Sequence, residues 1–233
     1  MSVSVAVFAS GGGSNFQSLL DHQTEDCDGR ISLLITDRPG IGAIDRADQA
    51  GIPHKIIPVK GRSPDAVGLE TLEVLEENEI HVILLAGYLR LLPPVIVQAY
   101  RRLILNIHPA LLPSFGGQGM WGHHVHEAAL AAGVSFTGPT IHFVDEEYDT
   151  GAILAQWPVP VMAGDTADTL AARVLKVEHL LYPRAANYLC RAVDRGVSVT
   201  PMTLPGSAFS FSESVSTEAI GEQIDAAFAG SGQ

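Results

Sequence analysis

A short polar pattern interrupts an apolar run in the middle of the chain, where Asn106 and His108 stand two residues apart and Pro109 follows. Side chains on a β-strand alternate between faces, so a strand over residues 103–108 would present both polar groups on one side. Pro109 cannot donate the next ladder hydrogen bond and would end that strand. An amide donor beside a titratable imidazole suits acyl-type chemistry, in which negative charge develops on a carbonyl oxygen. The alternative is a strand end with two incidental polar residues.

A glycine-rich segment at residues 10–15, Ser-Gly-Gly-Gly-Ser-Asn, lies between an apolar run and a helical pattern. Glycines let the backbone approach an anion, and a helix N-terminus capped by Ser14 or Asn15 would add free N–H groups and partial positive charge. The segment predicts a phosphate site, or else a plain strand-to-helix turn. It is not a Walker A loop, and Phe16 replaces the third glycine of the dinucleotide fingerprint. Asp37 could mimic the ribose-binding acid of a dinucleotide site.

Three histidines, His123, His124 and His126, raise the question of a metal. Neither cysteines nor a His-Glu-x-x-His pattern accompanies them, so we predict no metal, and a loop that closes over a substrate accounts for them as well. The remaining histidines, predicted to be structural or solvent-facing, are His22, His54, His81, His142 and His179. Asp149 lies in an acidic turn, which is usually just solvated. Near an imidazole, its carboxylate would favour the protonated ring and fix its orientation.

Alternating short apolar runs and helical patterns must position these residues. Strands are predicted at residues 3–9, 31–36, 54–59, 82–86, 103–108, 140–144 and 153–161, the last interrupted or at an edge because of its prolines. Helices are predicted at residues 15–22, 44–50, 66–78, 94–100, 125–132 and 166–192, the last with a break at Pro183. This alternation predicts an α/β fold with a doubly wound, mostly parallel central sheet flanked by helices.

Composition limits the function classes. Hydrophobic residues make up 46% of the 233-residue chain and charged residues 17%, which predicts a folded globular protein. The net charge of −12 argues against nucleic-acid binding. Cys27 and Cys190 lack metal-type spacing and suit a reducing cytosol. The first apolar run is too short for a signal peptide or a membrane span. We expect a cytoplasmic protein with one domain at 1–195 and a poorly ordered or loosely docked tail at 196–233.

Taken together, these segments resemble the phosphoribosylglycinamide formyltransferases, the folate-dependent enzymes of purine biosynthesis. The matching segments, in the order of that family, are residues 10–15, 85–90, 106–113, 141–144, 149–151, 172–174 and 178–179. The resemblance extends over residues 3–190 and implies a Rossmann-like formyltransferase domain. It also implies two small-molecule partners: 10-formyltetrahydrofolate as the formyl donor and glycinamide ribonucleotide (GAR) as the acceptor. Members of the family are often monomers or weak homodimers.

The resemblance assigns roles to the matched residues. The catalytic set would be Asn106, His108 and Asp149. The residues for GAR would be Gly12, Gly13, Ser14 and Asn15 at its phosphate and Glu178 at its ribose. The folate residues would be Leu89, Arg90, Leu91, Leu92, Asn106, Val144, Asp145 and Asp149, with Arg90 facing the glutamate carboxylate. Asn106 and a protonated His108 would donate to the oxyanion, while Asp149 would raise the His108 pKa and position a water.

Two positions depart from the family pattern. Pro64 stands where many relatives carry an arginine that helps to hold folate, and Arg62 could substitute for it. Thr137 stands where many relatives have a histidine. The nearest alternative is a 10-formyltetrahydrofolate hydrolase, which uses the same catalytic set but usually has an extra N-terminal domain. Methionyl-tRNA and sugar-nucleotide formyltransferases match less well. From another class, an NAD(P)-binding oxidoreductase or an inactive nucleotide-binding module stays open.

Overall fold

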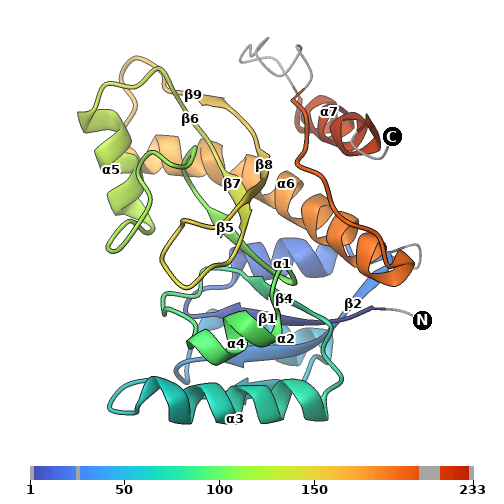
Figure 1. Ribbon diagram of the computed structural model, residues 1–233. Coiled ribbons are helices and arrows are strands. Elements are labelled where there is room, and N and C mark those ends of the chain that lie inside the picture. Colours follow the sequence, from blue (N-terminus) through green and yellow to red (C-terminus); the bar gives the residue numbers. More distant parts are fainter. Residues whose placement is uncertain (1–2, 25–26, 205–215, 231–233) are drawn as a thin grey trace.

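A seven-stranded sheet forms the centre of the computed structural model, which describes residues 3–24, 27–204 and 216–230 (Figure 1). In spatial order its strands are β3 (His54–Ile56), β2 (Gly29–Thr36), β1 (Val3–Ala9), β4 (Val82–Leu85), β5 (Ile104–His108), β7 (Thr140–Phe143) and β8 (Ile153–Gln156). Strands β1 to β5 pair in parallel, and β7 pairs antiparallel with both β5 and β8. The predicted mostly parallel, doubly wound sheet is therefore confirmed. The strand order reverses between β1 and β4, the point at which such sheets bind ligands.

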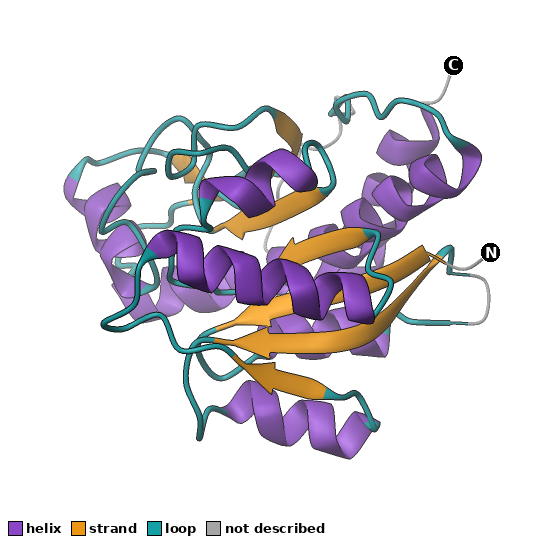
Figure 2. Ribbon diagram, turned by 60° about the horizontal axis from the view of Figure 1, so that its bottom comes forward, coloured by secondary structure: helices purple, strands orange, loops and turns teal. Residues whose placement is uncertain are grey.

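Helices cover both faces of this sheet (Figure 2). They are α1 (Ser14–Asp21), α2 (Gly42–Ala50), α3 (Pro64–Glu77), α4 (Pro94–Ala99), α5 (His123–Ala131) and α6 (Ala167–Arg195). Alternation along β1 serves both layers: Val5 and Val7 belong to the core cluster with α1 and α6, whereas Ala6 and Phe8 belong to the cluster with α3 and α4. Because helices cover both faces of the sheet, its strands need apolar side chains on both faces.

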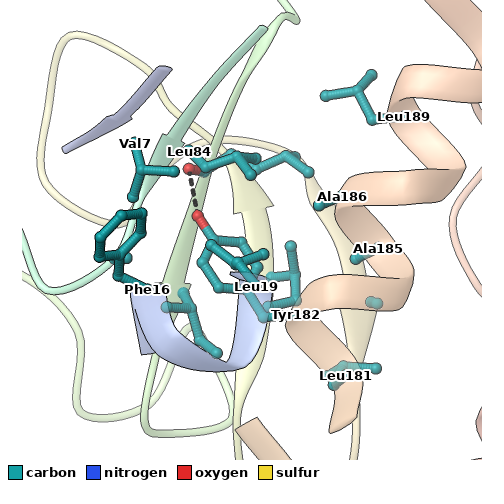
Figure 3. Close-up of a cluster of buried hydrophobic side chains, with 14 of the residues drawn as sticks. Val7, Phe16, Leu19, Leu84, Leu181, Tyr182, Ala185, Ala186 and Leu189 are labelled. Carbon is teal, nitrogen blue, oxygen red and sulfur yellow. Dashed lines mark hydrogen bonds between the residues drawn. The ribbon is translucent and has the colours of Figure 1, made fainter. Parts of the chain in front are cut away.

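Helix α6 runs through Pro183 without ending, so the predicted break there is wrong. Proline removes one helical hydrogen bond, but the buried side chains around it anchor both halves of the helix to the core. Figure 3 shows Tyr182 reaching from α6 toward the sheet, beside Leu19 and Phe16 of α1. The Tyr182 hydroxyl lies 2.9 Å from the carbonyl oxygen of Leu85 and 3.1 Å from that of Leu105. It therefore ties α6 to the end of β4 and to the β5 residue that precedes Asn106.

The segment predicted as one interrupted strand at residues 153–161 divides between two sheets. Its first part, β8, is the edge strand of the large sheet, and its second part, β9 (Val159–Pro160), pairs with β6 (Phe136–Thr137) in a two-stranded sheet. The interruption lies at Trp157 and Pro158, as the proline positions predicted.

The tail contains a helix that the sequence analysis did not predict, α7 (Thr217–Gly230). Its Ile220 and Ile224 are buried in the main core cluster, and Asp225 pairs with Arg184 of α6 at 2.6 Å. The spacing of four residues between the isoleucines was the available signal. The tail segment around Met202 also lies against the domain, because the Met202 N–H donates to the Leu154 carbonyl of β8 at 2.7 Å. Residues 205–215 and 231–233 of the predicted tail lie outside the described residues.

Candidate active site

The register of β5 against β7 brings together Asn106 and His142, which are direct partners across the antiparallel pair. The His142 Nδ1 lies 2.9 Å from the Phe143 carbonyl oxygen, which can only accept, so Nδ1 carries a proton. Its Nε2 therefore accepts from the Asn106 amide nitrogen at 3.0 Å. His142 is only 2% exposed, so the solvent-facing alternative in our prediction is wrong. The sequence analysis missed this site residue because Asn106 and His142 are 36 positions apart. The local spacing of residues does not reveal which strands pair.

The Asp149 carboxylate lies between two imidazoles. One oxygen is 3.5 Å from the Nδ1 of His108, and the other is 3.4 Å from the Nε2 of His142. The Gly117 N–H also donates to Asp149 at 2.8 Å. Asp149 has a φ of 59°, a left-handed conformation that is costly for a residue with a side chain. The predicted catalytic residues Asn106, His108 and Asp149 are thus brought together, with His142 as a fourth member.

Burial sets the charge state of this cluster. It lowers the pKa of His108 below its ordinary value, and the opposing effects of Asp149 and of the hydrogen bond to the Phe115 carbonyl are smaller. For Asp149, burial raises the pKa, but the neighbouring imidazoles of His142 and His108 and the Gly117 N–H together outweigh it and hold the pKa low. At neutral pH we therefore expect a neutral His108 beside an ionised Asp149. Asp149 raises the His108 pKa, as the resemblance implies, but desolvation opposes the protonated ring and is the larger effect.

A cavity of about 610 Å³ opens beside this cluster. Of the predicted site residues, those that line it are Asn15, Leu89, Arg90, Leu91, Leu92, Asn106, His108, Val144, Asp145, Asp149 and Glu178. Asn15 donates to the buried Glu178 carboxylate at 2.6 Å, and its own side-chain oxygen is buried without a partner. A buried unpaired oxygen is costly unless a ligand supplies a donor. The Asn15–Glu178 pair is therefore a polar recognition point within the cavity.

Gly12, Gly13 and Ser14 are not among the lining residues, although they lie next to Asn15 in the glycine loop. Gly13 is the N-cap of α1 with a φ of 75°, and no side chain caps the helix, so the expected cap by Ser14 or Asn15 is wrong. The uncapped first turn leaves its N–H groups free of side-chain acceptors.

Helix α2 holds the glycine loop from behind. A Cβ added at Gly13 would lie 2.9 Å from Ala43 of α2, so this position has no room for a side chain. The Arg46 guanidinium donates to the Gly12 carbonyl at 2.8 Å. On the other side, a Cβ at Gly11 or Gly12 would meet nothing within 4 Å. The loop therefore presents backbone to open space, as an anion nest requires.

The Asp37 carboxylate forms ion pairs with two arginines. Arg38 donates to it at 2.7 Å and Arg90 at 2.9 Å. Burial raises the pKa of Asp37, but hydrogen bonds from Arg38, Arg90 and Ser10 outweigh it and bring the pKa to about 2. A carboxylate engaged in this way is a poor ribose acceptor, which removes the support for a dinucleotide site. Arg90 still lines the cavity, in a pair with Asp37 that the sequence did not indicate.

The structure places both positions that depart from the family pattern outside the cavity lining. Pro64 occupies the first turn of α3 behind the N-cap Ser63, a position that proline favours. Arg62 binds Glu70 of the same helix at 2.6 Å and is not among the cavity residues, so its geometry does not support the suggested substitution. Thr137 is buried in β6, and its hydroxyl has no hydrogen-bond partner.

His126, which the sequence analysis considered for a metal or for a loop over a substrate, lies on α5 and lines the cavity. It is 4% exposed, and its Nδ1 has no hydrogen-bond partner. Burial, with a smaller contribution from His123, lowers its pKa from 6.5 to about 4. His126 therefore becomes protonated near pH 6.5 in the unfolded chain but only near pH 4 in the folded protein. It follows that the folded state loses stability as the pH falls through this window.

We expect His126→Phe to reduce this acid sensitivity. Between pH 7.5 and 5.0 the wild-type chain should lose about 2 kcal/mol more free energy of unfolding than the variant. Chemical denaturation at both pH values measures the difference. The exposed His124, changed to Phe, is the matched control and should keep the wild-type slope. Parallel pH profiles for the wild type and His126→Phe would contradict the assignment.

No group of three or more His, Cys, Asp or Glu side chains is placed to hold a metal ion in residues 3–24, 27–204 and 216–230. Over the same ranges, no helix has both the length and the apolar character needed to cross a membrane.

Comparison with known proteins agrees with this geometry. A chain from Vigna unguiculata named chloroplastic phosphoribosylglycinamide formyltransferase is 47% identical over 188 residues, which are 80% of this chain and 60% of that relative. The phosphoribosylglycinamide formyltransferase of Bacillus subtilis is 39% identical over 193 residues, or 82% of this chain and 96% of the relative. The chain thus spans about three fifths of the plant relative and nearly all of the bacterial one.

Solved structures and family models give the same result. The crystal structure of phosphoribosylglycinamide formyltransferase from Bacillus halodurans aligns with a TM-score of 0.75 and 39% identity, covering 83% of this chain and 96% of the other. The sequence model of the formyl transferase family matches residues 3–186. The chain therefore belongs to the formyl transferase family, among the phosphoribosylglycinamide formyltransferases.

Proposed function

We propose that this chain transfers the formyl group of 10-formyltetrahydrofolate to the amine of GAR, giving formyl-GAR in purine biosynthesis. One observation supports the proposal above all others. Four residues lie together in one cavity, Asn106, His108, His142 and Asp149, and the Asn15–Glu178 pair lines the same cavity. A volume of about 610 Å³ lies in the range typical of sites for small organic molecules.

Asn106 would stabilise the charge that develops on the reacting carbonyl. When the GAR amine attacks the formyl carbon, negative charge develops on the formyl oxygen. The Asn106 amide has two N–H groups and gives one to His142, so the other is available to this oxygen. The bond to His142 fixes the amide orientation before substrate arrives.

His108 and Asp149 would carry the proton. The His108 Nε2 donates to the Phe115 carbonyl at 2.8 Å, so the neutral ring keeps its lone pair on Nδ1, the nitrogen that faces Asp149. A proton released by the attacking amine can therefore be accepted at Nδ1, directly or through a water. Asp149 stabilises the imidazolium formed and favours passage of the proton to the departing folate nitrogen. The lowered His108 pKa suits this role, because the ring must begin neutral.

The rest of the site would hold the two substrates. The glycine loop at Gly12 and Gly13, with Ser14 and Asn15 in the first turn of α1, would bind the phosphate of GAR, and Glu178 its ribose hydroxyls. The open face of the loop supports this assignment, since nothing within 4 Å would meet a Cβ on Gly12. The residues proposed for the folate are Leu89, Arg90, Leu91, Leu92, Val144 and Asp145.

The decisive experiment is formyl release from 10-formyltetrahydrofolate, followed by absorbance, with and without GAR. We expect release only when GAR is present. Equal release without GAR would indicate the hydrolase, and no release under either condition would favour the inactive nucleotide-binding module. The same assay under saturating donor gives the KM for GAR.

Further proposals concern the whole protein. We propose that residues 1–195 form the formyltransferase domain and that the chain acts as a monomer or weak homodimer. We also propose that it is cytoplasmic and binds neither nucleic acid nor membranes. The net charge of −12 supports the absence of nucleic-acid binding. The location needs a direct test, because the Vigna relative is named chloroplastic.

A further inference from the structure

The rim of the active-site cavity carries an unusual amount of exposed apolar surface. Four large hydrophobic side chains both line the cavity and stand open to solvent: Leu89, Leu91, Trp121 and Tyr148, with exposed fractions of 38, 43, 50 and 39%. The inner wall differs, because Leu85, Leu92 and His108 are each no more than 5% exposed. Exposed apolar side chains gathered around a cavity mouth indicate a ligand that covers them.

The chemistry of the formyl donor indicates which part would lie there. The donor nitrogen that carries the formyl group is bonded directly to an aromatic aminobenzoyl ring, with a pterin on the other side and a charged glutamate at the far end of the ring. If the formyl group lies at Asn106 and His108, the flat pterin can pack against the buried inner wall of the cavity. The charged glutamate must then stay in water. The aminobenzoyl ring then has to pass through the rim.

Charge distinguishes the two aromatic side chains of the rim. Tyr148 lies in the turn with Asp145 and Glu147, both of which line the cavity and would repel the donor's glutamate. Trp121 lies in the loop at residues 116–122, Gly-Gly-Gln-Gly-Met-Trp-Gly, which contains no acidic residue. Its indole lies edge-on to the imidazole of His124, with ring centroids 5.2 Å apart. Arg90 also lines the cavity, but its charge is already paired with Asp37, so the Trp121 side of the rim is the more favourable exit.

The backbone of this loop allows the tryptophan to adjust to a ligand. Gly117, Gly119 and Gly122 all have positive φ, and a Cβ at any of them would meet nothing within 4 Å. At its base the loop is fixed, because the Gly117 N–H donates to Asp149. The loop thus joins a buried catalytic residue at one end to an exposed indole at the other.

We propose that Trp121 is a specificity-determining residue that packs against the aminobenzoyl ring of the formyl donor. The inference rests on the proposed function and deepens it. Aromatic contacts of this kind, together with the area they bury, correspond to about a tenfold change in affinity. The contact would favour donors that carry the aryl ring and contribute nothing to a pterin alone.

Isothermal titration with three non-formylated probes tests the proposal: tetrahydrofolate, tetrahydropteroate, which lacks the glutamate, and 6-methyltetrahydropterin, which lacks the aryl ring as well. We expect Trp121→Ala to weaken the first two by about tenfold and to leave the third within twofold of the wild type. Trp121→Phe should restore most of the loss, since it keeps an aromatic face. In the activity assay, the KM for the donor should rise in Trp121→Ala, with little change in kcat.

Phe136→Ala is the matched control, because Phe136 is a large exposed side chain, 46% accessible, that does not line the cavity. It should bind all three probes like the wild type. Equal weakening of all three probes by Trp121→Ala, or no change in any, would overturn the inference. Failure of the wild-type chain to bind tetrahydrofolate at all would instead overturn the proposed function.

Discussion

Replacing His108 with alanine, or Asp149 with asparagine, should reduce turnover by about 100-fold or more while the protein stays folded. His108→Ala removes the imidazole that accepts the amine proton. Asp149→Asn keeps a side-chain oxygen for the Gly117 N–H but removes the charge that stabilises the imidazolium. Asparagine is chosen because it tolerates the left-handed backbone at this position, where Asp149 has a φ of 59°. Steady-state kinetics with both substrates saturating measures the loss.

The controls separate chemistry from folding. His54→Ala removes a histidine of β3 that pairs with Asp48 of α2, outside the cavity, and should keep wild-type turnover. Thermal denaturation of each variant shows whether the fold is kept. A well-folded His108→Ala or Asp149→Asn enzyme with near-normal kcat would refute the catalytic assignment. Binding of tetrahydrofolate should survive in both variants, because the apolar wall that we propose for the folate is unchanged.

The second large effect is expected from Gly151→Ala. A Cβ at Gly151 would collide with the backbone carbonyl oxygen of Phe143, which cannot move without disturbing β7. The turn that carries Asp149 must then shift, and a displacement of about 1 Å at a catalytic group can cost 100-fold in rate. We also expect a loss of about 2 kcal/mol in the free energy of unfolding, or roughly 5 °C in Tm.

Gly11→Ala is the comparison for stability, since a Cβ at Gly11 meets nothing within 4 Å. Its Tm should stay close to that of the wild type. Scanning calorimetry and turnover, measured on the same preparations, show whether the two losses in Gly151→Ala occur together. Unchanged Tm and kcat in Gly151→Ala would mean that the turn relaxes without moving Asp149, contrary to the packing described above.

Local sequence determined the main elements and one half of the site. Apolar runs of strand length between helical patterns were enough for the doubly wound sheet, because a sheet covered on both faces needs strands that are apolar throughout. The spacing of Asn106 and His108 placed them on one face of β5, since side-chain alternation is a property of the strand itself. The glycine loop was recognisable for the same reason: its backbone freedom is intrinsic to its residues.

Tertiary structure alone decided the rest. His142 joins Asn106 only through the β5–β7 register, and Asp149 reaches His108 only because a distant turn is held by Gly117. Helix α6 continues through Pro183 because packing on the core outweighs one lost hydrogen bond. The pKa of His108 is likewise lowered mainly by burial, and burial results from several segments that pack around the ring. Pairing, packing and desolvation depend on residues far apart in the chain, whereas strand alternation and glycine freedom do not.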